Sequence, residues 1–246
     1  MIVMAWSFGF THERDATTDT ASIRIRFSGS PSIQDLAGWS DVLRTFINGA
    51  RCGAMSGASI LPSGSGCVVR EFFLDSCEAR VYLSNVALDS GAAIILCNMC
   101  QWGHVHIAKV DNITLHWPAI SHSPEALPRR WPQLSFELHE YDLVGQTIVV
   151  DIEFVDPQSA DMREIINHLI GQWFKVANWG GYASGQYSPS QSTILISSIP
   201  ITTEPHSINW HFDDYLCADS VFDGLLNCLE NVHQTYAAIR RVTIGE

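Results

Sequence analysis

The sequence predicts an α+β fold of two tandem ferredoxin-like repeats, each with the element order β-α-β-β-α-β, and three observations support this. A strand followed by an amphipathic helix occupies residues 147–176. The same order of elements is found in the first half of the chain. A proline-containing segment, residues 114–146, separates the two copies. For this split βαβ motif we expect antiparallel sheets with the helices packed on one face. The sequence does not decide how the two sheets lie relative to each other.

The best-defined pair of elements begins at Thr147. Apolar and charged residues alternate up to Val155, which indicates a strand with one buried face. Ser159 is placed to cap the following helix, with Asp161 in its first turn. The helix should end at Gly180-Gly181, where a left-handed backbone is tolerated. Its apolar side consists of Met162, Ile165, Ile166, Leu169, Ile170, Trp173 and Phe174.

The first half contains the same elements in the same order. Its first ten residues are mostly apolar and read as an edge strand or a packed arm, and residues 11–22 are polar and turn-like. Residues 49–66 are rich in Gly, Ser and Ala and predict a loop. The expected elements are a strand at 22–27, a helix from Pro31-Ser32 through Asn48, a weak strand at 58–61, a hairpin of 67–73 with 79–83, a helix at 88–102 ending at Gly103, and a strand at 105–110.

Superposing the halves supports an internal duplication. A shift of 127 positions places Phe27 on Phe154 and Gly53 on Gly180, and a shift of 133 places Tyr82 on Tyr215. We assign the difference of six residues to the middle hairpin loop, where insertions cost little. The predicted division is residues 1–113 for the first repeat with its N-terminal arm, 114–146 for a connector that packs on the body, and 147–246 for the second repeat.

Composition limits the possible functions. The 246 residues include 26 Asp and Glu against 14 Lys and Arg, a net charge of −12, which disfavours nucleic-acid binding and suits a basic partner or an ordinary acidic surface. No apolar stretch is long enough to span a bilayer. The seven cysteines read mostly as small buried side chains in a reducing compartment. We therefore expect a cytoplasmic protein, without membrane contact, as a monomer or homodimer.

One cysteine pair resembles a metal or redox motif. Cys97 and Cys100 form a CxxC that is followed by His104 and His106, a ligand set that would suit zinc. Both cysteines lie within an apolar helix, and there is no second CxxC. Core packing is the preferred interpretation, so we predict no metal and no cofactor; a zinc-stabilised structural protein is kept as an alternative. Residues 63–66 lack the context of a catalytic serine or a phosphate loop.

Two stretches are candidates for a contact surface. The first is the strand 209–214, where His211 and Asp213 share one face and Asp214, Asp219 and Asp223 follow. A solvated edge strand whose charges prevent aggregation explains this stretch equally well. The second is the glycine-containing loop of Trp179, Tyr182 and Tyr187. Aromatic side chains on such a loop suit protein contacts, although they could equally cover the open face of a sheet.

With its length, acidic balance, repeated α+β halves and the Trp179-Gly-Gly-Tyr182 segment, the chain resembles the immunity proteins of bacterial polymorphic-toxin systems, most of all the immunity protein 52 family. The resemblance implies a protein without catalysis that binds and neutralises a cognate secreted toxin, as in type VI secretion, and the expected toxin is a basic nuclease. The four aspartates would then take the place of phosphates. The alternative is a small-molecule-binding protein or enzyme on the same duplicated scaffold, using His211 and Asp213.

Overall fold

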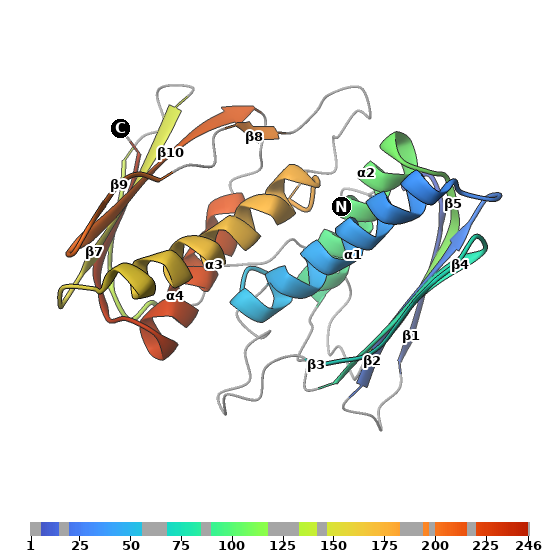
Figure 1. Cartoon of the computed structure of the whole chain (residues 1–246), viewed down its shortest axis with the longest axis horizontal. Coiled ribbons are helices and arrows are strands. Elements are labelled where there is room, and N and C mark those ends of the chain that lie inside the picture. Colours follow the sequence, from blue (N-terminus) through green and yellow to red (C-terminus); the bar gives the residue numbers. More distant parts are fainter. Residues whose placement is uncertain are drawn as a thin grey trace.

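A computed structural model describes the protein over residues 6–14, 20–55, 68–84, 90–117, 133–141, 147–182, 194–196, 200–215 and 220–245. These residues form two α+β halves, as the sequence predicts (Figure 1). None of the described helices is long and apolar enough to cross a membrane.

The first half is a five-stranded sheet with two helices. Its strands lie in the order β1-β5-β2-β4-β3. The four strands of the predicted motif are antiparallel, and β1 adds a parallel edge strand beside β5, so the sheet is mixed. The elements are β1 (Gly9–Arg14), β2 (Thr20–Phe27), α1 (Ile33–Cys52), β3 (Val68–Leu74), β4 (Glu78–Ser84), α2 (Ser90–His106) and β5 (Val110–Trp117).

The second half repeats this plan. Its strands lie in the order β6-β11-β7-β10-β8, with β9 also paired to β10, and here β6 is the parallel edge strand, beside β11. The elements are β6 (Glu137–Glu140), β7 (Thr147–Phe154), α3 (Ala160–Asn178), β8 (Ile194–Ile196), β9 (Pro200–Glu204), β10 (Ser207–Tyr215), α4 (Ser220–Thr235) and β11 (Ile239–Gly245).

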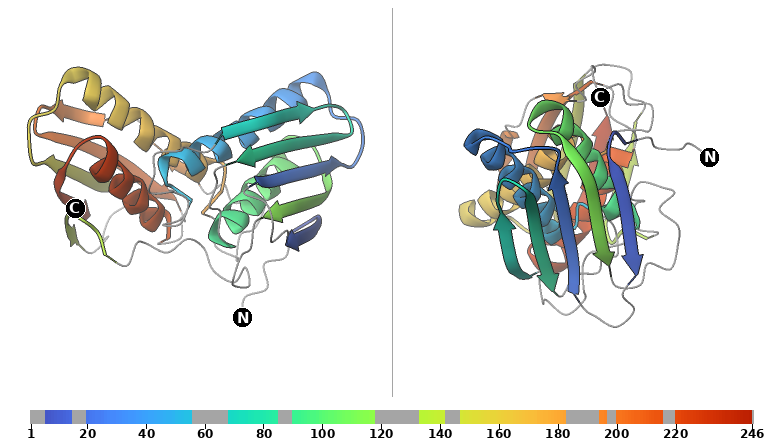
Figure 2. Two further views of the ribbon diagram at one scale, coloured as in Figure 1. Left: turned by 90° about the horizontal axis from the view of Figure 1, so that it is seen from below. Right: turned by 90° about the vertical axis from the view of Figure 1, so that its right-hand side faces the viewer.

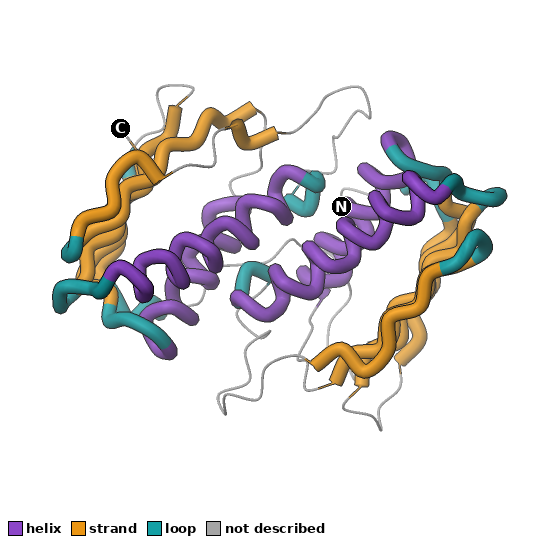
Figure 3. The backbone as a smooth tube through the Cα atoms, in the orientation of Figure 1, coloured by secondary structure: helices purple, strands orange, loops and turns teal. Residues whose placement is uncertain are grey.

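The four helices lie between the two sheets. Figures 1 and 3 show the sheets at the two ends of the molecule, with α1 packed along α3 in the middle. Figure 2 shows the same arrangement from two further sides. A single cluster of buried apolar side chains runs through both halves. Each sheet therefore packs one face on helices and turns its other face outward.

Local sequence explains how the two long helices begin and end. The Ser159 side chain accepts the backbone N–H of Met162, so the predicted cap is confirmed; the Ser32 side chain caps α1 in the same way by accepting the N–H of Asp35, at the predicted helix start. At the other ends, Gly53 and Gly180 have φ values of 85° and 72°, the left-handed backbone that glycine adopts without a steric cost.

Strand pairing confirms the duplication but corrects its register. In the first sheet Ile23 pairs with Val81 and Leu115; in the second, Val150 pairs with Trp210 and Ile244. The first strands are 127 positions apart, as predicted, whereas Val81 and Trp210 are 129 apart, as are Leu115 and Ile244. The predicted shift of 133 is thus wrong by four residues. A slip of four keeps every side chain on the same face of a strand and nearly the same side of a helix, so hydrophobic patterns cannot detect it.

Two predicted helix ends are also wrong, for a common reason. α1 continues beyond Asn48 to Cys52, and α2 continues through Gly103 to His106, so the strand expected at 105–110 begins only at Val110. A β-carbon on Gly49 would lie 2.6 Å from Val176 of α3, and one on Gly103 would lie 2.8 Å from the Trp39 ring. Both glycines permit close packing within a helix and do not end it.

The remaining corrections concern edge strands. Thr11–Arg14, expected as a turn, belong to β1, and the connector contributes both the end of β5 and all of β6. The described part of the connector around β6 packs on the body, because Phe136 is buried and Leu134 and Leu138 contact the core. The weak strand expected at 58–61 lies outside the described residues.

Candidate functional site

The outer face of the second sheet carries His211, one of the predicted site residues. Along β7, Val150, Ile152 and Phe154 are buried against the helices, so the intervening Asp151 and Glu153 point outward. The same alternation in β10 buries Trp210 and Phe212 and turns Asn209 and His211 outward. His211 is half-buried and pairs with Val149, beside these carboxylates.

Four carboxylates and one arginine lie on this face, which we call the acidic face. In one row across the strands Arg241 lies between Glu137 and Glu153, and Ser207 links Glu153 to Glu204. In the next row Asp151 lies between Thr243 and Asn209. The acidic face is defined as Glu137, Asp151, Glu153 and Glu204 together with His139, His211 and Arg241.

The arginine neutralises part of this charge. Arg241 forms an ion pair with Glu153, which raises the pKa of the guanidinium further. Partial burial, followed by repulsion from Glu153, raises the pKa of the Asp151 carboxyl. Glu137 hydrogen-bonds the His139 ring at 2.8 Å. With four carboxylates and one arginine, the face is therefore a negatively charged surface on a sheet.

Of the other predicted aspartates, only Asp223 has a described side chain. Asp213 occupies β10 opposite Thr147, and Asp214 pairs with Leu195, but their side chains, like the whole of Asp219, lie outside the described residues. Asp223 is in the first turn of α4, in the helical layer on the other side of the sheet from His211. Placing Asp223 on one surface with His211 is therefore wrong.

The described part of the aromatic loop, residues 179–182, packs against the first repeat. Tyr182 is only 1 % exposed, its hydroxyl donates to the Ala54 carbonyl of the first repeat at 2.6 Å, and burial raises its pKa. Trp179 is half-buried and packs edge-on against Trp102 of α2, with ring centroids 4.6 Å apart. The prediction of Tyr182 as a partner contact is wrong because this residue joins the two repeats. Tyr187 lies outside the described residues.

The CxxC motif is buried. Cys97 and Cys100 are fully inaccessible, and burial raises the pKa of both thiols, which makes thiolate formation unfavourable. His104 accepts the Val110 N–H through Nδ1 at 3.0 Å. His233 makes the equivalent bond to the Ile239 N–H in the second repeat, at the same distance. The described residues contain no cluster of three or more potential metal ligands.

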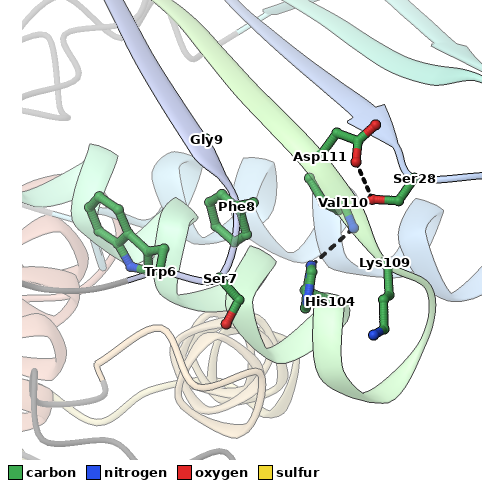
Figure 4. A pocket seen from close by; sticks show the side chains of 9 residues that line it. All are labelled: Trp6, Ser7, Phe8, Gly9, Ser28, His104, Lys109, Val110 and Asp111. Atoms are coloured by element: carbon green, nitrogen blue, oxygen red, sulfur yellow. Dashed lines mark hydrogen bonds between the residues drawn. The ribbon is translucent and has the colours of Figure 1, made fainter.

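An open pocket lies at the start of β1 and was not predicted (Figure 4). Its volume is about 570 Å³. The Ser28 hydroxyl already donates to Asp111, and burial, with repulsion from Lys109, lowers the pKa of His104. These residues come from four separate segments, so the sequence gives no signal for them. The lining consists of Trp6, Ser7, Phe8, Gly9, Ser28, His104, Lys109, Val110 and Asp111.

Comparison with known proteins assigns no family. No family model matches the chain, and no curated protein does. Among solved structures, Complex III2 from Candida albicans has 8% identity, covers 94% of this chain and 80% of its own, and has a TM-score of 0.21. The first half of the periplasmic protease PqqL from Escherichia coli has 10% identity, coverages of 87% and 67%, and a TM-score of 0.21. A conserved protein from Enterococcus faecalis V583 has 8% identity, coverages of 91% and 76%, and a TM-score of 0.22. Similarities this weak carry no argument about function.

Proposed function

We propose that this chain is a protein-binding protein without catalysis, whose acidic face engages a basic surface of its partner. The observation that supports the proposal is the concentration of carboxylates on one outward sheet face. The partner is a toxic nuclease, and the chain neutralises it inside the producing cell as an immunity protein.

Electrostatics fits this role. A nuclease must attract a polyanion, so its cleft is basic, and an acidic protein is steered toward the same cleft. Asp151, Glu137 and Glu204 are positioned to take the place of phosphates, while Glu153 is already paired with Arg241. Because β7 is held by hydrogen bonds on both sides, the backbone of Asp151 needs little ordering on binding.

The test begins with capture of the partner by the tagged chain and by a neutralised variant. The variant Glu137→Gln/Asp151→Asn/Glu204→Gln removes three charges and leaves the Arg241–Glu153 ion pair in place. The matched control, Asp41→Asn/Glu71→Gln/Glu164→Gln, removes the same charge from exposed positions on α1, β3 and α3, away from the acidic face. We expect one basic protein bound by the wild type and the control but lost by the variant.

Toxicity and kinetics complete the test. Co-expression with the wild type should suppress the toxicity of the captured protein, and the variant should associate with it roughly tenfold more slowly at low salt. A captured partner that is harmless to cells would refute the immunity role. Equal association rates for variant and control would refute the role of the acidic face.

A small-molecule-binding protein or enzyme is the second candidate, favoured by the pocket near His104. Lys109 and Asp111 line this pocket and would contact a small polar ligand. This candidate predicts a ligand whose saturable stabilisation of the fold is lost in Lys109→Met. Stabilisation that persists in this variant would place the ligand elsewhere.

A further inference from the structure

The outer face of the first sheet carries the opposite charge to the acidic face. On β2, Ile23, Ile25 and Phe27 are buried, so Arg24 and Arg26 point outward and are exposed. Arg80 of β4 pairs directly with Arg24 across the strands. We call Arg24, Arg26 and Arg80 the arginine face; Figure 2, right, looks onto this side of the sheet.

One carboxylate organises the arginine face without neutralising it. Glu78 accepts the Arg24 side chain at 2.7 Å and also forms an ion pair with Arg80. These two pairs lower the pKa of Glu78 against the opposing effect of its burial, so the carboxylate stays ionised. Arg26 forms no ion pair with any other described residue. Glu71 of β3 is also exposed on this face, so three guanidinium groups face two carboxylates and the net charge of the face is positive.

The duplication relates the two faces position by position. With the shift of 127 that superposes Phe27 on Phe154, Arg24 corresponds to Asp151 and Arg26 corresponds to Glu153. Both pairs occupy the second strand in from the parallel edge strand, between equivalent neighbours. The same scaffold thus presents positive charge at one end and negative charge at the other.

The spacing within the two corresponding pairs of charges also matches. Outward residues two apart on a strand are about 6.5 Å apart, and neighbouring strands are about 4.8 Å apart, in any sheet. Arg24 and Arg26 therefore have the same separation as Asp151 and Glu153, whereas Arg80, opposite Arg24, corresponds to the uncharged Asn209, opposite Asp151. The faces lie at opposite ends of the molecule and point away from each other, so neither can reach the other within one chain (Figure 1).

We propose that the arginine face binds the acidic face of a second copy of this chain, giving head-to-tail association. A contact between two different faces is heterologous, so it extends into rings or filaments and does not stop at a symmetric dimer. The second copy is chosen as the occupant because its acidic face supplies Asp151 and Glu153 at the positions equivalent to Arg24 and Arg26. Contacts between exposed charges are individually weak, so the association is reversible and sensitive to salt.

This inference goes beyond the proposed function and is tested on the purified chain alone. Both processes use the acidic face, so a basic partner and a second copy compete for it. If the chain does not self-associate, the proposed binding of a basic partner is unaffected, and the reverse also holds, because self-association is measured without a partner.

Charge reversal of each face gives the test. Arg24→Glu/Arg26→Glu makes both faces acidic, and Asp151→Lys/Glu153→Lys makes both faces basic. Sedimentation at about 10 mM salt, where the screening length is about 30 Å, should show association of the wild type but neither variant alone. An equimolar mixture of the two variants should associate, as should a chain with all four substitutions, since its faces are exchanged but still complementary.

The controls separate the faces from net charge and folding. Arg44→Glu/Lys175→Glu changes the net charge as the first variant does, at exposed helix positions, and should associate like the wild type. At about 1 M salt, where screening falls to about 3 Å, association of the wild type should drop at least tenfold. If a reversed variant does not fold by circular dichroism, the milder Arg26→Gln and Asp151→Asn should each reduce association several-fold.

Several results would overturn the proposal. They are a wild type that stays monomeric at low salt, association that survives reversal of either face, and a four-substitution chain that stays monomeric. Binding of a single-stranded oligonucleotide through Arg24 and Arg26, without self-association, would assign the arginine face to nucleic acid.

Discussion

Replacing Tyr182 by phenylalanine removes one oxygen atom from the contact between the two repeats. That oxygen donates a 2.6 Å hydrogen bond to the Ala54 carbonyl, and both residues are almost completely buried. Without the hydroxyl, the carbonyl loses this partner where water cannot replace it, which costs about 1–3 kcal/mol. The ring and its packing are unchanged, so no cavity term is added.

Urea unfolding measures this loss. With a slope of about 2 kcal/mol per molar, the midpoint of Tyr182→Phe should fall by roughly 0.5–1.5 M with the slope unchanged. Tyr236→Phe is the matched control, because Tyr236 is 40% exposed and its substitution should change stability by less than about 0.5 kcal/mol.

The same variant distinguishes a core residue from a contact residue. If Tyr182 acted at a partner surface, its hydroxyl could be lost without affecting stability. A midpoint of Tyr182→Phe that matches those of the wild type and Tyr236→Phe would therefore refute the inter-repeat hydrogen bond as a source of stability.

Three further predictions concern single positions. Gly224→Ala places a β-carbon 2.4 Å from the Tyr182 hydroxyl and should lower stability by about 1–3 kcal/mol, whereas Gly171→Ala, in open space, should raise it by about 0.5–1 kcal/mol; thermal unfolding with shifts of one sign for both would contradict this. Ser159→Ala should cost about 1 kcal/mol through loss of the α3 cap, and Ser159→Asp should recover most of it in the same assay. The pKa of Asp151 is raised above 3.8, so its folded state holds a proton more strongly than the unfolded chain and loses stability as pH rises through this range. The stability of Asp151→Asn relative to the wild type should therefore increase between about pH 3 and pH 6, by at most about 1 kcal/mol because the side chain is partly exposed. Parallel curves of stability against pH for the two proteins would argue against the raised pKa.

Local signals in the sequence predicted most of the fold. Ser32 and Ser159 start their helices through side-chain hydrogen bonds to residues three positions away, so a short window of sequence contains the whole interaction. Gly180 ends α3 in the same local way, as predicted, but α1 runs past the predicted Asn48 to Cys52 before Gly53 ends it. Three of these four helix ends thus follow from interactions that span few residues.

Contacts between distant segments could not be predicted in this way. Gly49 and Gly103 were interpreted as the start of a loop and a helix end because nothing nearby in sequence reveals Val176 or Trp39. The match of Tyr82 to Tyr215 misled the register for the same reason: only the strand pairing distinguishes 129 from 133.

In the candidate site, some features were predicted from local sequence and others depend on contacts between distant segments. The alternation along β10 correctly predicted that His211 points outward, and the alternation along β7 predicted that Asp151 and Glu153 lie on the face opposite the buried one. That these residues share one face with His211 follows only from the pairing of β7 with β10. Tyr182 was misplaced because its partner, Ala54, is 128 residues away.

The opposite charges at Arg24 and Asp151 bear on how this molecule could have arisen. A single ancestral repeat that packed its helices against those of an identical copy would give the same four-layer body as a symmetric dimer. In such a dimer every substitution appears on both ends at once, so the two ends must carry the same charge. Joining the copies into one chain removes that constraint, because Arg24 and Asp151 are then encoded separately. Covalent linkage thus allows one scaffold to acquire polarity, with two ends that select different partners.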